Sequence, residues 1–265
     1  MKFRIWISKI LIRFSSYLQS LSIFTRSLPI ALLSPENLTE MTNQYYNHPK
    51  RVTDWSNTEN RGLYDYETDF FKRYNLKNGK ILAIGAGGGR EAWGIAKLGF
   101  DVVAIDISEG IINNSKRKIS DLTNLNINFM TKDVYSLNFP PNSFDAILFA
   151  GGGYSFIPSS RKRTEVLKNI KRILKKEGVF LLSFMMGENN QTNRFFPIYK
   201  FLAKLVFGNR EIEKGDFIIG GGEFHHCFLC KEEIIQEAVA AGFIVDEIDI
   251  KYKSGYKFAY LKSQI

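Results

Sequence analysis

The chain of 265 residues is 45% hydrophobic, which is enough to bury a full core, and we expect one large domain with additions. The formal net charge is +9, but five basic residues and no acidic one precede Glu36, so the body has only a mild basic excess, which argues against a nucleic-acid partner. The two cysteines, Cys227 and Cys230, are too few for a disulfide-rich secreted scaffold, and we expect a cytoplasmic protein.

Residues 1–33 are predicted to form a basic, amphipathic helical arm. Between Phe3 and Leu21 apolar side chains recur at spacings of three and four, with lysine, arginine and serine on the other side. Charges and serines interrupt this stretch too often for a transmembrane span or a secretory signal. Two interpretations stay open: the helix lies peripherally on the inner face of an anionic membrane, or it packs against the body or a second subunit.

Residues 34–64, rich in Asn, Thr and Pro, are predicted to be a linker or cap before a domain over residues 65–265. In this domain strand-like and helical stretches alternate, which is typical of a mostly parallel sheet covered by helices on both faces, with ligands at the carboxyl ends of the strands. We expect strands near residues 81–84, 102–105, 127–130, 146–150, 179–184, 243–250 and 257–261, and helices near residues 65–74, 91–98, 109–122, 161–175 and 231–241.

The first predicted strand runs into a glycine cluster in which Gly85, Gly87 and Gly89 alternate. Glycine is needed where the backbone approaches a ligand or adopts a positive φ, and the amides of the following helix can bind a carboxylate. A dinucleotide fingerprint would place a glycine at the sixth position of the turn, where this chain has Arg90. A nicotinamide-dependent oxidoreductase is therefore disfavoured, although it remains an alternative.

Acidic residues follow the next two strands. Asp106 ends the second strand and can accept hydrogen bonds from both hydroxyls of a ribose, and Asp133 follows the third strand and can accept one from an adenine amine. Because the carboxyl ends of parallel strands lie at one edge of the sheet, we expect these acids to converge on one crevice.

In these motifs the sequence resembles the class I S-adenosylmethionine (SAM)-dependent methyltransferases, from about Asp65 to the C-terminus. The resemblance rests on IGAGGGRE (residues 84–91), AIDIS (104–108), KDVYSLNFPPNSFDAILFAGG (132–152) and RILKKEGVFLLS (172–183). It implies a doubly wound α/β fold with a mostly parallel, seven-stranded, Rossmann-like sheet whose last strand is antiparallel, and SAM as the cofactor.

The resemblance also implies roles for individual residues. The three alternating glycines would hold the methionine part of SAM, Asp106 the ribose and Asp133 the adenine amine, with Ile107 and Val134 beside the adenine. The family carries an acid two positions before the first glycine, where this chain has Ala83, and we expect Glu91 to substitute for it. The alternative is that Glu91 only complements the dipole of its helix.

The acceptor site is predicted to come from segments added to the core, above all residues 187–228, as a lid over a small-molecule or lipid-like acceptor. Histidine titrates near neutrality, so His225 and His226 are the candidates for a general base, and strand alternation would point one of them inward. Further candidates for closing over the cofactor are Tyr154, Tyr45, Tyr46 and Arg61.

The segment HHCFLC (residues 225–230) raises the question of a metal. A structural zinc site usually needs a second, separated pair of ligands, which the sequence does not offer, so we expect no metal. The remaining alternative is a non-catalytic protein that binds SAM or docks on a membrane. This alternative stays open because Ala83 stands where the family carries an acid.

Overall fold

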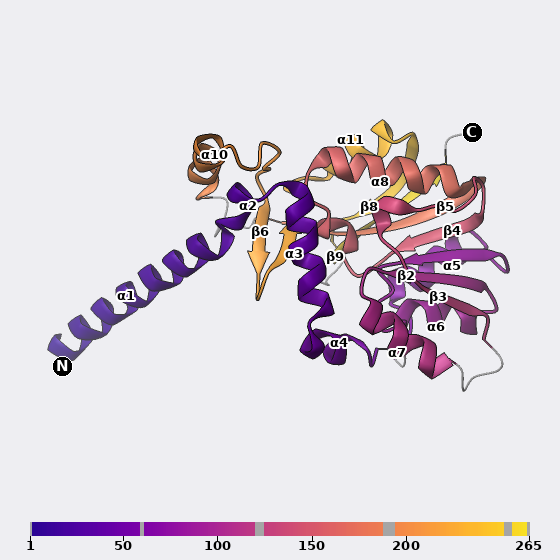
Figure 1. Ribbon diagram of the computed structural model, residues 1–265, viewed down its shortest axis with the longest axis horizontal. Coiled ribbons are helices and arrows are strands. Elements are labelled where there is room, and N and C mark those ends of the chain that lie inside the picture. Colours follow the sequence, from indigo (N-terminus) through magenta and orange to yellow (C-terminus); the bar gives the residue numbers. More distant parts are fainter. Residues whose placement is uncertain (1, 59–60, 120–124, 188–193, 252–255, 264–265) are drawn as a thin grey trace.

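The computed structural model describes residues 2–58, 61–119, 125–187, 194–251 and 256–263. They form a sheet covered by helices, a smaller cap built from two distant parts of the chain, and a long helix that projects away from both (Figure 1). No helix in the described residues is long and apolar enough to cross a membrane.

The sheet has the strand order β3-β2-β1-β4-β5-β9-β8 in the described residues. The first five strands run parallel, and β9, the last strand of the chain, runs antiparallel to both neighbours. The predicted fold class is therefore confirmed. The strands of this sheet are β1 (Lys80–Ile84), β2 (Asp101–Asp106), β3 (Ile127–Thr131), β4 (Phe144–Phe149), β5 (Leu174–Met185), β8 (Phe243–Asp249) and β9 (Tyr256–Ser263).

Alternating side chains of the strands feed two cores, one on each face of the sheet. In β1, Leu82 and Ile84 join the core under α8 and α11, whereas Ile81 and Ala83 join the core under α5, α6 and α7. These strands are buried on both faces, which explains their nearly continuous apolar sequences. The covering helices are α5 (Asp65–Arg73), α6 (Arg90–Lys97), α7 (Glu109–Ile119), α8 (Ser160–Ile173) and α11 (Lys231–Ala240), and two short turns are η2 (Val134–Ser136) and η3 (Gly153–Phe156).

The boundary between α8 and β5 differs from the sequence prediction. The helix ends at Ile173 and the strand begins at Leu174, although the sequence predicts a helix to Lys175 and a strand from Val179. The register of β4 and β5 shifts between the pairs Phe144–Leu174 and Ala146–Val179, so the intervening charged residues lie outside the regular ladder. The end of the predicted helix over residues 109–122 lies outside the described residues.

The cap combines the segment after the arm with the segment inserted after β5. Its elements are α2 (Pro29–Leu32), α3 (Pro35–Asn47), α4 (Pro49–Trp55), α10 (Phe196–Leu205), β6 (Asp216–Ile219) and β7 (Glu223–His226). Each of these four cap helices, α2, α3, α4 and α10, carries a proline at N1 or N2. A third core of Ile30, Leu38, Tyr199 and Phe224 joins both parts of the cap. Residues 35–55 are therefore largely helical and belong to the cap.

The arm is the helix α1 (Lys2–Ser27), and it projects from the body (Figure 1). Every side chain from Ile5 to Gln19 is exposed, and packing on the body begins only near Ile23. There the ring of Phe24 stacks on Tyr199 of α10 at a centroid distance of 5.4 Å. For residues 5–19, the interpretation that the arm packs on its own body is therefore wrong.

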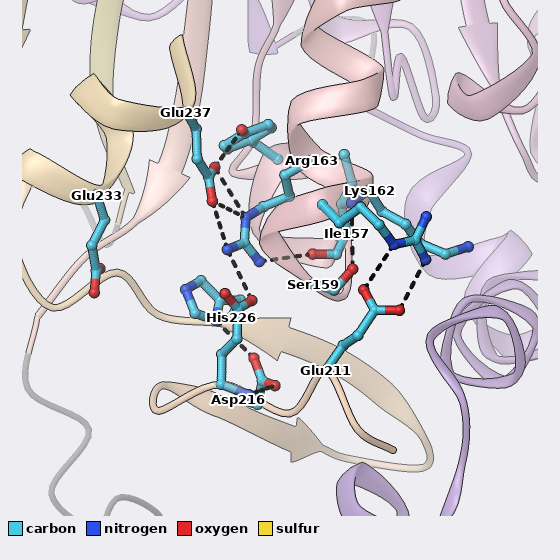
Figure 2. Close-up of polar contacts among 12 residues, drawn as sticks. Ile157, Ser159, Lys162, Arg163, Glu211, Asp216, His226, Glu233 and Glu237 are labelled. Carbon is cyan, nitrogen blue, oxygen red and sulfur yellow. Dashed lines mark hydrogen bonds and ion pairs between the residues drawn. The ribbon is translucent and has the colours of Figure 1, made fainter. Parts of the chain in front are cut away.

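A buried charge cluster joins α8, α11 and the chain between α10 and β6 (Figure 2). Arg163 is 1% exposed; its Nη2 lies 2.8 Å from Glu237 Oε1 and 3.0 Å from Glu213 Oε2, and its Nη1 donates to the carbonyl of Ile157. The Tyr154 hydroxyl donates to Glu237 Oε2 at 2.5 Å. Burial lowers the pKa of Arg163, but the two carboxylates outweigh this effect and hold its guanidinium charged.

Replacing this arginine tests the cluster. In Arg163→Met the buried carboxylate of Glu237 and the half-buried one of Glu213 lose their counter-charge, and we expect the free energy of unfolding at neutral pH to fall by about 3–5 kcal/mol. Burial already raises the pKa of Glu213 and Arg163 opposes the shift, so without Arg163 this pKa rises further and the loss shrinks as the pH is lowered and Glu213 is protonated. Urea unfolding at several pH values measures both effects. Arg161→Met removes exposed ion pairs of the same helix and is expected to change little, so equal losses would contradict a special role for the cluster.

Candidate active site

A cavity of about 460 Å³ lies at the carboxyl ends of β1, β2, β3 and β4 and is closed over by the cap. This is the edge at which the sequence predicts the ligand. The cavity lies beside the point where the strand order reverses, between β1 and β4, which is where open α/β sheets bind ligands.

The glycine turn forms the floor of the cavity, and its backbone has positive φ angles there. Gly85 and Gly87 line the cavity and have φ angles of 68° and 51°, which side-chain-bearing residues rarely adopt. Gly89 does not line the cavity; it is the residue before α6, and a Cβ there would lie 2.7 Å from the Trp93 ring. A Cβ on Gly88 would lie 2.2 Å from the carbonyl oxygen of Trp55, so this glycine lets α4 of the cap close on the turn.

Asp106 is fixed by backbone amides on both of its carboxylate oxygens. Oδ2 accepts from the amide of Gly87 and Oδ1 from that of Ser108, each at 2.9 Å. Burial raises the pKa of the carboxyl, and these hydrogen bonds oppose the shift. Each oxygen keeps a free lone pair toward the cavity, which suits a ligand with two neighbouring hydroxyls.

The other predicted adenine-side residues also line the cavity, namely Ile107, Asp133 and Val134. Asp133 Oδ1 accepts from the amide of Tyr135 at 2.9 Å, which fixes the carboxylate at the start of η2. The cavity thus offers carboxylates at the ends of two strands and a glycine floor beside them. This set of acceptors fits the ribose and adenine of SAM.

Glu91 lies in a buried ionic group beside the cavity. Arg90 Nη2 lies 2.5 Å from Glu91 Oε1 and 2.6 Å from Glu67 Oε1, so one guanidinium faces two carboxylates. Burial, together with the charge of Glu67, raises the pKa of Glu91. Arg90 and Glu91 both line the cavity, so the Glu91 carboxyl is placed to accept from the cofactor's amino group, whereas Ala83 is buried in the core under α6. The substitution of Glu91 for the family's acid stays a prediction.

The structure corrects the placement of Tyr154. Its side chain is fully buried, stacks on Phe228 at a centroid distance of 5.8 Å and donates to Glu237. It does not line the cavity, because η3 turns this side chain toward α11, whereas its neighbours Gly153 and Phe156 do. Tyr154 therefore belongs to the buried charge cluster and not to the cofactor site.

The two histidines lie on opposite faces of β7, as strand alternation predicts. His225 lines the cavity, whereas His226 points away from it and its Nδ1 lies 2.7 Å from Asp216 Oδ1 (Figure 2). Burial lowers the pKa of His226 to about 4, so its ring is neutral near neutral pH. Of the two candidates for a general base, the structure brings only His225 to the cavity.

His225 belongs to a group that the sequence analysis did not find. Its Nε2 lies 3.3 Å from Glu223 Oε2, and the hydroxyl of Tyr46 donates to the other oxygen of Glu223. Burial would raise the pKa of the Glu223 carboxyl, but the contacts with His225 and Tyr46 outweigh it and hold that pKa below its ordinary value. Glu223 and His225 are two positions apart on one strand, which is the pattern that could have revealed the pair.

The inserted segment covers the cavity only in part. Ile219, Glu223 and His225 of the hairpin β6–β7 line it, but no residue of α10 does. The hairpin thus lines the cavity and α10 does not, and that residues 187–228 form a lid stays a prediction; residues 188–193 lie outside the described residues. From the other part of the cap, Tyr46, Trp55, Thr58 and Arg61 line the cavity, whereas the ring of Tyr45 lies under Arg51.

Neither cysteine takes part in a metal-ligand cluster among the described residues. Cys227 is buried and donates to the carbonyl of Gly187, and Cys230 is exposed. The three closely spaced side chains that could hold a metal ion are Glu213, Asp216 and His226. Arg163 lies 3.0 Å from Glu213 within that group and already supplies a positive charge.

Comparison with known proteins agrees with this geometry. A family model described as a methyltransferase domain matches residues 81–178. The Bacillus subtilis (strain 168) protein YqeM, whose name describes a methyltransferase, is 27% identical over 129 residues, which are 47% of this chain and 51% of that protein. A demethylmenaquinone methyltransferase of Renibacterium salmoninarum is 33% identical over 92 residues, or 35% of this chain and 37% of that protein. The chain thus spans about half or less of the length of these relatives.

Among solved structures, 1,6-didemethyltoxoflavin-N1-methyltransferase of Burkholderia thailandensis is similar in fold, with a TM-score of 0.62 at 16% identity over 88% of this chain and 92% of that chain. That structure holds 1,6-didemethyltoxoflavin and S-adenosylhomocysteine. Residues 81–178 thus match a methyltransferase domain, and the similar proteins support a SAM-dependent methyltransferase with SAM as the cofactor. The nicotinamide-dependent alternative does not stand.

Asp106→Ala tests the cofactor site. The variant loses a carboxylate acceptor for two hydroxyls, and we expect the Kd for S-adenosylhomocysteine to rise about a hundredfold, since a hydrogen bond to a charged group contributes about 1.5–3 kcal/mol. Isothermal titration calorimetry measures this Kd. Asp101→Ala, at the opposite end of the same strand, is the matched control and is expected to bind like the wild type. Equal affinity of the two variants would contradict the assignment of Asp106.

Proposed function

We propose that the protein is a SAM-dependent methyltransferase that acts on a small-molecule or lipid-like acceptor which loses a proton during the reaction. The observation that carries the proposal is that one cavity joins the glycine turn, Asp106 and Asp133 to His225 and Glu223. When bound, SAM supplies an electrophilic methyl group on a sulfonium centre. The chain must then hold the acceptor close and aligned and exclude water.

His225 is proposed as the general base, acting through Nδ1. Its Nε2 lies 3.3 Å from Glu223 Oε2, and because a carboxylate can only accept, the proton of the neutral ring belongs on Nε2. Nδ1, which lies 3.0 Å from the sulfur of Met185, then carries the lone pair. After Nδ1 takes the acceptor's proton, the carboxylate of Glu223 would stabilise the imidazolium, and Tyr46 would hold Glu223 in place.

The cavity wall supports an acceptor that is largely apolar. Aromatic and aliphatic side chains line the cavity that holds His225, namely Tyr46, Trp55, Phe149, Phe156, Ile157, Met185 and Ile219. Such walls suit a flat ring system with an acidic hydroxyl or ring N–H. Two of the similar proteins, a demethylmenaquinone methyltransferase and a didemethyltoxoflavin N-methyltransferase, are named for acceptors of this chemical type.

The arm is proposed to hold the protein peripherally on an anionic membrane surface. Its exposed apolar side chains include Trp6, Phe14 and Tyr17, and Lys9 and Arg13 flank them on the helix. No acidic residue precedes Glu36, so the arm would be attracted to acidic lipid headgroups. This arrangement would keep the enzyme in the cytoplasm while placing it beside lipid-like acceptors.

The proposed activity is tested with purified protein, SAM carrying a labelled methyl group, and a panel that contains a demethylated naphthoquinol, a fused heteroaromatic N–H compound and a lipid extract. Transfer of label to one acceptor class is the expected outcome. Binding of S-adenosylhomocysteine without transfer to any acceptor would instead support the non-catalytic alternative.

Once an acceptor is found, His225→Asn and His226→Asn separate the two histidines. We expect kcat to fall about 10²- to 10⁴-fold in His225→Asn, with unchanged affinity for S-adenosylhomocysteine, because the base is lost and the cofactor site is intact. His226→Asn is the matched control and should keep most of its activity. Wild-type kcat in His225→Asn would exclude His225 as the base.

A further inference from the structure

The helix α10 (Phe196–Leu205) exposes an apolar stripe that neither the cavity nor the cap core uses. Ile198, Phe201 and Leu205 follow one another at spacings of three and four and are 46%, 64% and 63% exposed. Val206 and Phe207 continue the surface beyond the helix, and Phe207 is 82% exposed. A contiguous apolar patch of this kind marks an interaction site. We call these five residues the α10 patch.

The other side of α10 is anchored in the cap. Tyr199 and Ala203 are buried in the third core, and the Tyr199 hydroxyl donates to the carbonyl of Phe24 at the end of the arm. The outward direction of the α10 patch is therefore set by packing on the inward side. Cap residues of α3 and β7 line the cavity, so the cap has one side toward the cavity and another toward the surroundings.

Basic residues surround the α10 patch. Arg194, Lys200, Lys204 and Arg210 lie within or next to it, and no acidic residue occurs between Arg194 and Arg210. Lysine stems can lie along an apolar surface while their charged ends reach outward. An apolar stripe with basic flanks is complementary to a bilayer of acidic lipids, in which the apolar side chains enter the interface and the cations meet the headgroups.

The inward side of α10 contacts the base of the arm, where Phe24 of α1 lies near Phe195, at a centroid distance of 5.3 Å, and Tyr199, at 5.4 Å. The ribbon shows α10 beside the end of α1 that joins the body (Figure 1). The helix that bears the α10 patch is thus attached to the base of the arm, although 175 residues separate Phe24 from Tyr199 in the chain.

We propose that the α10 patch is a bilayer-docking surface for anionic phospholipids, separate from the arm in sequence and adjacent to it in space. Two contacts define an orientation on the membrane where a single helix cannot, and this orientation turns the cap toward the bilayer. The docking surface does not depend on which acceptor the cavity takes, and its test uses lipid binding alone.

The test is co-sedimentation of the full chain with vesicles of phosphatidylcholine containing about a quarter phosphatidylglycerol. The double variant Phe201→Glu/Leu205→Glu leaves the arm unchanged. We expect its partition coefficient onto the vesicles, calculated from the fraction of protein bound at each lipid concentration, to be at least about tenfold lower than that of the wild type. The wild type should bind pure phosphatidylcholine more weakly and should lose binding as salt is raised. Leu98→Glu/Val239→Glu is the matched control, since both residues are exposed apolar side chains outside the α10 patch.

Calorimetric titration with S-adenosylhomocysteine shows that each variant is folded and keeps its cofactor site. Wild-type partitioning of Phe201→Glu/Leu205→Glu would overturn the inference, whatever the arm does. Sedimentation equilibrium tests whether a second copy of the chain occupies the α10 patch instead. If the wild type were a dimer and this variant a monomer, a second copy would cover the α10 patch, and the inference would also be overturned. Lys200→Glu/Lys204→Glu, which leaves the apolar stripe intact, should weaken binding to the anionic vesicles and reduce its salt dependence.

Discussion

The buried carboxylate of Asp106 is the constraint on which the site depends. It ends β2, yet it is held by the amide of Gly87 in the turn after β1, so it ties the ends of two neighbouring strands together. A carboxylate buried in this way is costly unless its oxygens are hydrogen-bonded. The backbone supplies one donor to each oxygen, and a ligand with paired hydroxyls would supply the rest. The floor of the cavity is thus organised around this one group.

The cap places the proposed catalytic residues over this floor. It is built from the first part of the chain and from the insertion after β5, and neither part has a core of its own. The shared cluster around Leu38 and Phe224 holds them together, and Phe224 lies between the two residues that the cap contributes to the proposed base, Glu223 and His225. Because β7 alternates, one residue of the strand fills the cap core while its neighbours face the cavity. The position of the proposed base therefore depends on packing remote from the cofactor.

Two arginines show why part of the site escapes prediction from local patterns. Arg90 and Arg163 are both buried, Arg90 against Glu67 and the adjacent Glu91, and Arg163 against Glu213 and Glu237, which lie far along the chain. The pairing fixes which side chains turn away from the cavity, and Tyr154 is one of them. A sequence pattern contains the charges but not their partners, so it could not separate Tyr154 from the residues that line the cavity.

The sequence by itself determined the sheet, the glycine turn and the convergence of Asp106 and Asp133, because strand periodicity and the rule that parallel strands end at one edge are local or general constraints. It also determined that one histidine of the pair would face inward. Only the tertiary structure decided which one, because that depends on how β7 packs against α3 and on the contacts of Glu223 and Tyr46. Only the tertiary structure decided the position of α10 as well, because its apolar sequence is also compatible with a lid over the cavity. Burial of Tyr199 on one side of that helix left the other side exposed and away from the cavity.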